Sequence, residues 1–149
     1  LACDHGALDL KKAIMAHLDK RGLAYKDFGC YTKDSCDYPD FAGPAAQAVA
    51  SGECDRGIFG DGVGYGSAMI ANKLRGIFAV VCQDPFCAAL ARQHNDSNVL
   101  CLGGKIIGPA IAMEIVKTWM HTDPLTAEKY RRRIKKVQEI DAKHCVAVK

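Results

Sequence analysis

The chain has 149 residues, of which 49% are hydrophobic and 25% are charged, and its formal net charge is +3. This length corresponds to one domain, and this composition is typical of a globular protein and excludes wholesale disorder. The slight excess of basic residues does not indicate a nucleic-acid-binding protein. No apolar run approaches the roughly 20 residues that a membrane-spanning helix needs, so the sequence does not predict a membrane protein.

Apolar segments with strand character alternate with helical segments along the chain. The first strand is already under way at Leu1, so a few residues are expected to precede it. Later strands are expected at 23–28, 57–60, 76–82 and 97–102. Helices are expected from residue 8 to Gly22, at 40–51, from the glycine-rich turn to about 73, and at 85–93, 109–121 and 127–142. Five strand–helix cycles predict one α/β domain over residues 1–149, with a five-stranded parallel sheet covered on both faces.

Eight cysteines are spread along the chain without a CxxC pair and without the spacing of a zinc site. Several, such as Cys82 and Cys101, follow apolar residues, where a free thiol packs as a small hydrophobic side chain. We therefore expect reduced thiols in a cytoplasmic protein and no metal site, with disulfides as the less favoured alternative.

Polar clusters follow several of the expected strands, and parallel sheets of this kind bind ligands at the carboxyl ends of their strands. Asp4 and His5 follow the first strand. They can form the mouth of a site, or Asp4 can simply cap the next helix. The segment GDGVGYGS at 60–67 follows a later strand. Its alternating glycines let backbone N–H groups converge on a phosphate or an oxyanion, and a merely tight turn is the alternative.

Two further groups have a functional and a structural interpretation. His94, in the segment RQHND at 92–96, is either a catalytic side chain or a cap at a helix end. Lys129 and Arg133 lie four residues apart in a basic run, and thus on one face of a helix. They can form a two-pronged phosphate grip, although such a run is more often a solvated helix surface.

Taken in order, the segments of this chain resemble those of one family, which contains ribose-5-phosphate isomerase B and the subunits of galactose-6-phosphate isomerase. The matching segments are ACDH at 2–5, DYPD at 37–40, GECD at 52–55, ANK at 71–73, HNDSNVL at 94–100 and GGKIIG at 103–108. They span nearly the whole chain with their spacing intact.

The resemblance implies a Rossmann-like α/β/α sandwich and a homodimer or tetramer with sites shared between subunits, in which the C-terminal helix takes part in dimerisation. It also implies conversion of an aldose phosphate to a ketose phosphate through an enediolate. No metal, organic cofactor, nucleic acid or membrane partner is implied.

The resemblance also assigns roles to individual residues. His94 matches a histidine that helps to open the sugar ring, and Asn95 matches an asparagine that holds the substrate's hydroxyls or its intermediate. Asp4 and His5 match residues that line the sugar and the phosphate. Apart from these assignments, our candidates for shaping the pocket are Tyr38, Val63, Tyr65 and Phe78.

A second set of assignments concerns the glycine-rich loop and the phosphate. The loop amides that stabilise the enediolate oxygen match Gly62, Gly64 and Gly66, with Ser67 as a further substrate contact. Arg133 matches a phosphate-binding arginine that reaches into a neighbouring subunit's site. Lys129 stands where many members have a second arginine, so the charge is kept but the bidentate fork is lost.

The largest departure from the family lies at the proton-transfer base. Many members have a cysteine where this chain has Asp61, and some have a glutamate where this chain has Ser67. Asp61 can replace the cysteine, because carboxylates are the bases of other sugar-phosphate isomerases. Alternatively, Asp61 only accepts N–H groups of its loop.

Three functional hypotheses follow. The first is an aldose–ketose isomerase, with ribose 5-phosphate and ribulose 5-phosphate as the favoured pair. The second is an A-type subunit of galactose-6-phosphate isomerase, inactive without a cysteine-bearing partner chain, because Asp61, Gly64, Gly66, Ser67 and Met69 resemble that subunit. The third is a sugar-phosphate binding or sensing protein without catalytic activity.

Overall fold

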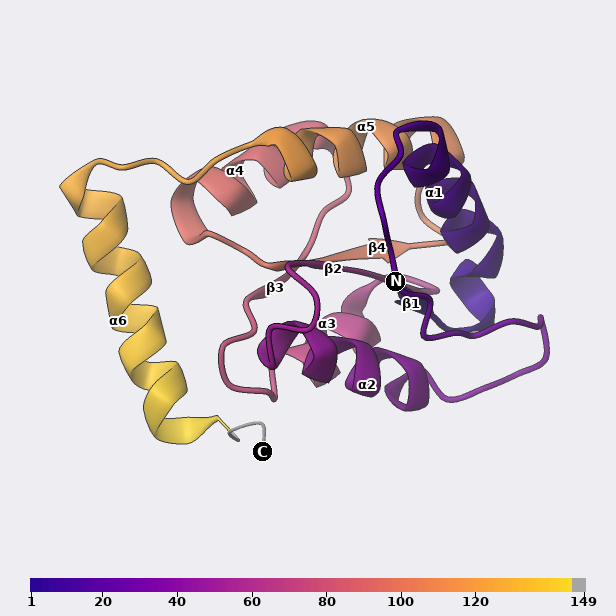
Figure 1. Cartoon of the computed structure of the whole chain (residues 1–149), viewed down its shortest axis with the longest axis horizontal. Helices are drawn as coiled ribbons and strands as arrows, with labels where there is room; N and C mark the ends of the chain where they lie inside the picture. The colour runs from indigo at the N-terminus through magenta and orange to yellow at the C-terminus, as the bar shows by residue number, and fades with distance from the viewer. Residues whose placement is uncertain (146–149) are drawn as a thin grey trace.

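The computed structural model describes residues 1–145, and its elements alternate between strand and helix along the chain (Figure 1). In order, they are β1 (Ala2–Cys3), the short 3-10 helix η1 (His5–Ala7), α1 (Leu8–Lys20), α2 (Pro39–Ala50), β2 (Gly57–Asp61), α3 (Tyr65–Ala71), β3 (Ala79–Val81), α4 (Pro85–Asn95), β4 (Val99–Gly103), α5 (Pro109–His121) and α6 (Glu128–His144). The helices lie within a few residues of their predicted positions. The strand predicted at 76–82 is reduced to three residues.

The strands form a parallel sheet in the order β1-β2-β4-β3. In the central pair, β2 and β4, Gly57 lies opposite Val99 and Asp61 lies opposite Gly103. All carboxyl ends therefore lie at one edge of the sheet, which we call the carboxyl edge. The opposite edge, where the strands begin, is the amino edge.

Helices cover both faces of the sheet, as predicted. Leu100 and Leu102 of β4 point to one face, where they pack in one apolar cluster with residues of α1, α4 and α5. Val99 and Cys101 point to the other face and pack with residues of α2 and α3. This alternation follows from the two-residue period of a strand, and it gives the Rossmann-like three-layer sandwich that Figure 1 shows.

The strand predicted at 23–28 is absent from the observed sheet. This segment runs beside β1, and the amide of Phe28 donates to the carbonyl of Leu1 at 2.9 Å. In a regular parallel ladder the amide of Cys3 would then donate to Phe28, but it donates to the carbonyl of Gly29 at 2.7 Å. Gly29 has a φ of +99°, which strands do not adopt. The backbone shifts by one residue here, so the described part of the chain forms four strands and not the predicted five.

Helix α6 lies apart from the rest of the molecule, beside the amino edge (Figure 1, yellow). None of its residues, Glu128–His144, is buried. It is linked to the body by a hydrogen bond from the amide of Gly76 to Asp141 at 2.8 Å and by the stacking of Tyr130 on His94. No helix within residues 1–145 combines the length and the apolar character needed to cross a membrane.

Candidate active site

The glycine-rich loop after β2 is organised around the carboxylate of Asp61, which is 5% exposed. Its Oδ1 accepts the amides of Val63 at 2.9 Å and Gly64 at 2.6 Å, and its Oδ2 accepts the amide of Ser67 at 2.7 Å. Gly64 has a φ of +87°, a conformation that only glycine adopts without strain. Of the two roles that the sequence leaves open for Asp61, this geometry favours the acceptor of loop N–H groups.

The same hydrogen bonds decide which loop amides remain available. Gly64, whose amide is predicted to bind the enediolate oxygen, donates instead to Asp61. The amides of Gly62, Tyr65 and Gly66 have no hydrogen-bond partner among residues 1–145. The buried hydroxyl of Ser67 also lacks a partner there. Two of the three predicted glycine amides can thus receive an oxyanion.

Two side chains border the loop. A β-carbon at Gly66 would lie 3.0 Å from the ring of Tyr38, so the ring packs directly on this glycine. A β-carbon at Gly62 would lie 3.5 Å from Cδ and 4.0 Å from Nζ of Lys105. Lys105 was not among the site residues predicted from the sequence. Its position in the family-like segment GGKIIG, just after a strand, was the signal that could have found it.

Asp4 and His5 lie at the end of β1, beside this loop. Oδ1 of Asp4 accepts the amide of Gly6 at 2.8 Å and caps η1, so the capping interpretation is confirmed. Asp4 is also close to the loop, because a β-carbon at Gly6 would lie 3.1 Å from Asp4 Oδ1 and 3.2 Å from the amide nitrogen of Gly62. The two interpretations of this segment are therefore compatible.

The ring of His5 is oriented by the segment before α2. Its Nδ1 accepts the backbone amide of Cys36 at 3.3 Å. A neutral imidazole that accepts at Nδ1 carries its proton on Nε2. His5 can therefore donate a hydrogen bond through Nε2 to an oxygen of a bound substrate.

A group of thiols packs behind His5. Sγ of Cys3 lies 3.9 Å from Sγ of Cys30, and Sγ of Cys36 lies 3.8 Å from Nδ1 of His5. Burial raises the pKa of Cys3 to about 12, and burial also raises the pKa of Cys36. The thiols of Cys3 and Cys36 are therefore protonated at neutral pH and are not activated nucleophiles. All eight cysteines, which lie within residues 1–145, are unpaired.

The remaining predicted residues gather at the amino edge. His94 and Asn95 end α4, which returns from the carboxyl edge and leads into β4. The ring of His94 stacks on Tyr130 with centroids 4.7 Å apart, and Nζ of Lys129 lies 4.9 Å from the centroid of the same tyrosine. Asn95 and Arg133 line one cavity of about 220 Å³.

The structure thus separates the predicted site residues into two groups. Asp4, His5, Tyr38 and the loop of Asp61 are at the carboxyl edge, whereas His94, Asn95, Lys129 and Arg133 are at the amino edge. The five-residue strands β2 and β4 lie between the groups, a length of about 15 Å at roughly 3.3 Å per residue. Side chains of one chain cannot act on one small substrate across that distance.

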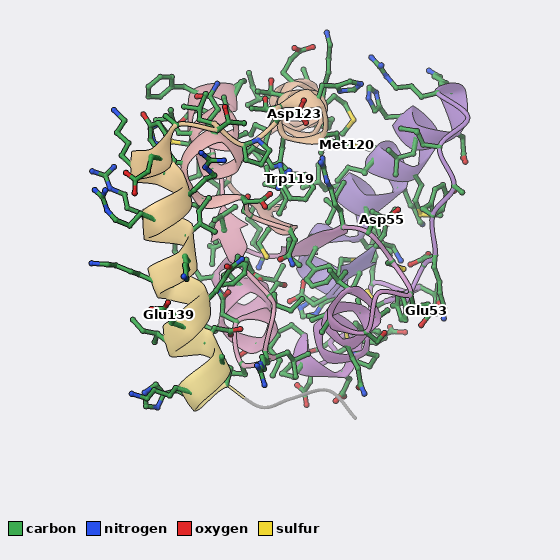
Figure 2. The ribbon with its side chains drawn as sticks, turned by 60° about the vertical axis from the view of Figure 1, so that its left-hand side comes forward. Glu53, Asp55, Trp119, Met120, Asp123 and Glu139 are labelled. Atoms are coloured by element: carbon green, nitrogen blue, oxygen red, sulfur yellow. The ribbon has the colours of Figure 1, made fainter. Side chains whose placement is uncertain are left out.

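A hollow of about 670 Å³ contains none of the predicted site residues. Trp119 and Met120 at the end of α5 and Glu53 and Asp55 of the loop after α2 are among the residues that line it (Figure 2). Leu1 also borders it. The candidate active site is therefore the carboxyl edge and not this hollow.

The fold and the site define a parallel α/β protein with a glycine-rich loop, two of whose glycine amides are unpaired, at the carboxyl edge of its sheet. The family described as Ribose/Galactose Isomerase matches residues 1–137. The chain belongs to this family and is an isomerase of it.

Individual relatives agree with this assignment. The chain is 47% identical to ribose-5-phosphate isomerase B of Escherichia coli K12 over 118 residues, which are 79% of each chain. It is 32% identical to galactose-6-phosphate isomerase subunit LacB of Clostridium acetobutylicum over 140 residues, 94% of this chain and 81% of that one. The solved structure of ribose-5-phosphate isomerase B from Clostridium thermocellum superposes with a TM-score of 0.91 at 43% identity, covering 95% of both chains.

Proposed function

We propose that this protein interconverts ribose 5-phosphate and ribulose 5-phosphate through an enediolate. The observation that carries the proposal is the carboxyl edge, where the amides of Gly62 and Gly66 are unpaired and the amide of Gly62 lies beside the carboxylate of Asp4. Preorganised donors of this kind stabilise an oxyanion as it forms. The substrate is chosen on the relatives, since the identity to the ribose-5-phosphate isomerase B of E. coli, 47%, exceeds that to LacB, 32%.

The substrate's phosphate needs positive charge and hydrogen-bond donors. At the carboxyl edge these come from Nε2 of His5 and from Lys105, whose side chain lies over Gly62. Lys129 and Arg133 would add two further cations from a neighbouring subunit. Arg133 can bind two phosphate oxygens at once, whereas Lys129 contributes a point charge.

We further propose that each site is completed by a second copy of the chain. His94, which would open the sugar ring, and Asn95, which would hold its hydroxyls, lie at the amino edge and are too distant from the glycine loop of their own chain. Helix α6 would mediate the pairing. Its Val137 is 49% exposed and its Ile140 is 63% exposed, and a partner surface would cover such side chains.

A second candidate function remains specific enough to test. The pattern of Asp61 and Ser67 around the glycines resembles the A-type subunit of galactose-6-phosphate isomerase, and the carboxylate of Asp61 is occupied by three amides. A chain of this kind would give no turnover alone and would become active with a cysteine-bearing partner chain.

The test is turnover by the purified chain alone on ribose 5-phosphate, allose 6-phosphate and galactose 6-phosphate, read as ketose formation. We expect turnover of ribose 5-phosphate with the highest kcat/KM. Preference for another sugar would correct the substrate. Calorimetric binding of a sugar phosphate with no turnover of any sugar would favour the subunit hypothesis or the binding protein, and activity restored by a cysteine-bearing relative would select the former.

A further inference from the structure

We propose that Asp4, and not Asp61, is the base that moves the proton between the two reacting carbons. This inference rests on the proposed isomerase function and concerns the chemical step at the same site. It assigns a catalytic role to a residue for which the family resemblance implies only contact with the sugar and phosphate.

The carboxylate of Asp61 is already engaged in hydrogen bonds with its own loop. Both of its oxygens accept backbone amides, at 2.6 to 2.9 Å, and the side chain is almost fully buried. To accept a proton from a substrate C–H bond, Asp61 would have to give up a hydrogen bond from the amide of Val63, Gly64 or Ser67. Those bonds hold the loop in the shape that leaves the amides of Gly62 and Gly66 available. Asp61 is therefore a positioning residue.

Asp4, in contrast, has one carboxylate oxygen that is available to accept a proton. Its Oδ1 is fixed by the amide of Gly6 at 2.8 Å, which orients the carboxylate. Its Oδ2 has no hydrogen-bond partner within the described chain, and no cation there lies within 4.0 Å of the carboxylate. The side chain is partly exposed at the edge where substrate would bind. An oriented and unpaired carboxylate is what general-base catalysis requires.

Asp4 also lies beside one of the proposed oxyanion donors, the amide of Gly62. A β-carbon built on Gly6 would lie 3.1 Å from Asp4 Oδ1 and 3.2 Å from the amide nitrogen of Gly62, so these two atoms are close to the same point. In an aldose–ketose isomerisation the base removes a proton from the carbon adjacent to the carbonyl whose oxygen becomes the oxyanion. A base and an oxyanion donor must therefore lie near each other, and Asp4 and Gly62 do.

The step balances without any other reactant. The carboxylate of Asp4 takes the proton from C2 of the aldose and becomes a carboxylic acid, and the electrons of that C–H bond form the enediolate double bond. The carboxylic acid then returns the proton to C1. The hydroxyl proton of C2 passes to the oxygen of C1, so the ketose differs from the aldose only in the placement of two hydrogens.

The experiment compares Asp4→Asn with Asp61→Asn in the full-length protein. Asparagine at position 4 can still cap η1 through its Oδ1, so this variant keeps the fold but loses the base. We expect kcat to fall by about a thousandfold, in the range for loss of a general base, with the Kd for ribose 5-phosphate within about threefold. Exchange of the substrate's C2 hydrogen with D2O, followed by NMR, should fall in parallel. Asp4→Glu should recover part of the activity.

Asp61→Asn should behave differently, because its side-chain amide would place a donor against one of the loop N–H donors. We expect a lower Tm and a raised KM, while the residual turnover keeps the pH profile of the unaltered protein. The matched control is Asp9→Asn, which alters an exposed carboxylate in α1 that forms an ion pair with Lys33 and should leave kcat unchanged.

The inference is overturned if Asp4→Asn keeps kcat within tenfold of the unaltered protein. It is also overturned if Asp61→Asn abolishes C2 exchange while its Tm and its Kd stay unchanged. An unaltered protein that turns over no sugar phosphate would instead remove the proposed function itself. The two failures are thus distinguishable.

Discussion

The carboxyl edge and the amino edge of the sheet use their polar groups in different ways. At the carboxyl edge, Asp61 and Asp4 bond to backbone amides of their own turns, and the loop shape is set within one chain. At the amino edge, Asn95 and Arg133 line a cavity between α4 and α6, a helix with no buried residue. One edge is complete as a structure, whereas the other presents groups that would act outside their own chain.

The largest expected effect comes from separating the two edges onto different subunits. Asp61→Ala should inactivate the carboxyl edge, and Arg133→Ala should inactivate the amino edge. If sites are shared in a dimer, refolding the two variants together gives mixed dimers with one intact site. About a quarter of the original activity should then return, by the statistics of random pairing. Steady-state turnover before and after mixing measures this.

A matched mixture controls for simple refolding. Asp61→Ala and Asp4→Asn both alter the carboxyl edge, so their mixed dimers contain no intact site and should stay inactive. If the mixture of Asp61→Ala with Arg133→Ala also stays inactive, although native mass spectrometry shows that mixed dimers form, each site is built within one chain.

A change of stability is the next largest effect, and it tests what supports the carboxyl edge. Lys11 is 4% exposed, and its ammonium donates to Asp27 at 2.6 Å and to the carbonyl of Cys30 at 2.7 Å. Lys11→Met removes one partner of a buried ion pair and should lower the free energy of unfolding by about 3 kcal/mol. Urea denaturation followed by circular dichroism gives the value. A loss below 1 kcal/mol would mean that the segment before α2 holds its place without this lysine.

A smaller effect is expected where the loop meets the pocket wall. Gly66→Ala would place a methyl group 3.0 Å from the ring of Tyr38, so the ring must move by a few tenths of an ångström. Because Gly66 does not have a left-handed φ, the backbone tolerates alanine. We expect KM to rise several-fold with Tm nearly unchanged. A drop in Tm with an unchanged KM would show that the contact serves the fold and not the pocket.

The smallest effect concerns a helix cap at the carboxyl edge. Asp84 accepts the amide of Cys87 at 2.8 Å, and this hydrogen bond lowers the pKa of its carboxyl from the ordinary aspartate value. The stabilisation is therefore fully present above that ordinary value and is lost as the pH falls through the lower pKa of the folded state. Asp84→Asn keeps a cap acceptor but cannot titrate. The Tm difference between the two proteins should shrink as the pH falls below about 4, the range of unperturbed aspartate.

The sequence predicted the elements well where local chemistry determines them. Helix α5 begins at Pro109 and ends at His121, as predicted, because a proline at the first turn and a regular apolar face define it. The strand at 23–28 could not be judged in the same way. Its apolar pattern is that of a strand, but the one-residue shift at Gly29 depends on pairing with β1, which is a tertiary contact.

The candidate site was only partly predictable for a related reason. An aspartate at position 61 fits both roles, a catalytic base and an acceptor of loop amides. Only the positions of the amides of Val63, Gly64 and Ser67, which the sequence does not give, distinguish the two. The separation of His94 from Asp61 was, in contrast, available from chain order. A residue that ends a helix and precedes a parallel strand lies at the amino edge, opposite the end of every strand.

In helix α6, selection for stable folding and selection for substrate binding can act on different residues. Since none of Glu128–His144 is buried, neither apolar cluster of the sheet depends on these side chains. Substitutions at Lys129 or Arg133 would therefore alter the proposed contact with the substrate's phosphate with almost no penalty in folding. If that proposal holds, new phosphorylated sugars could be accommodated by single substitutions in this helix, while the body of the protein stays the same.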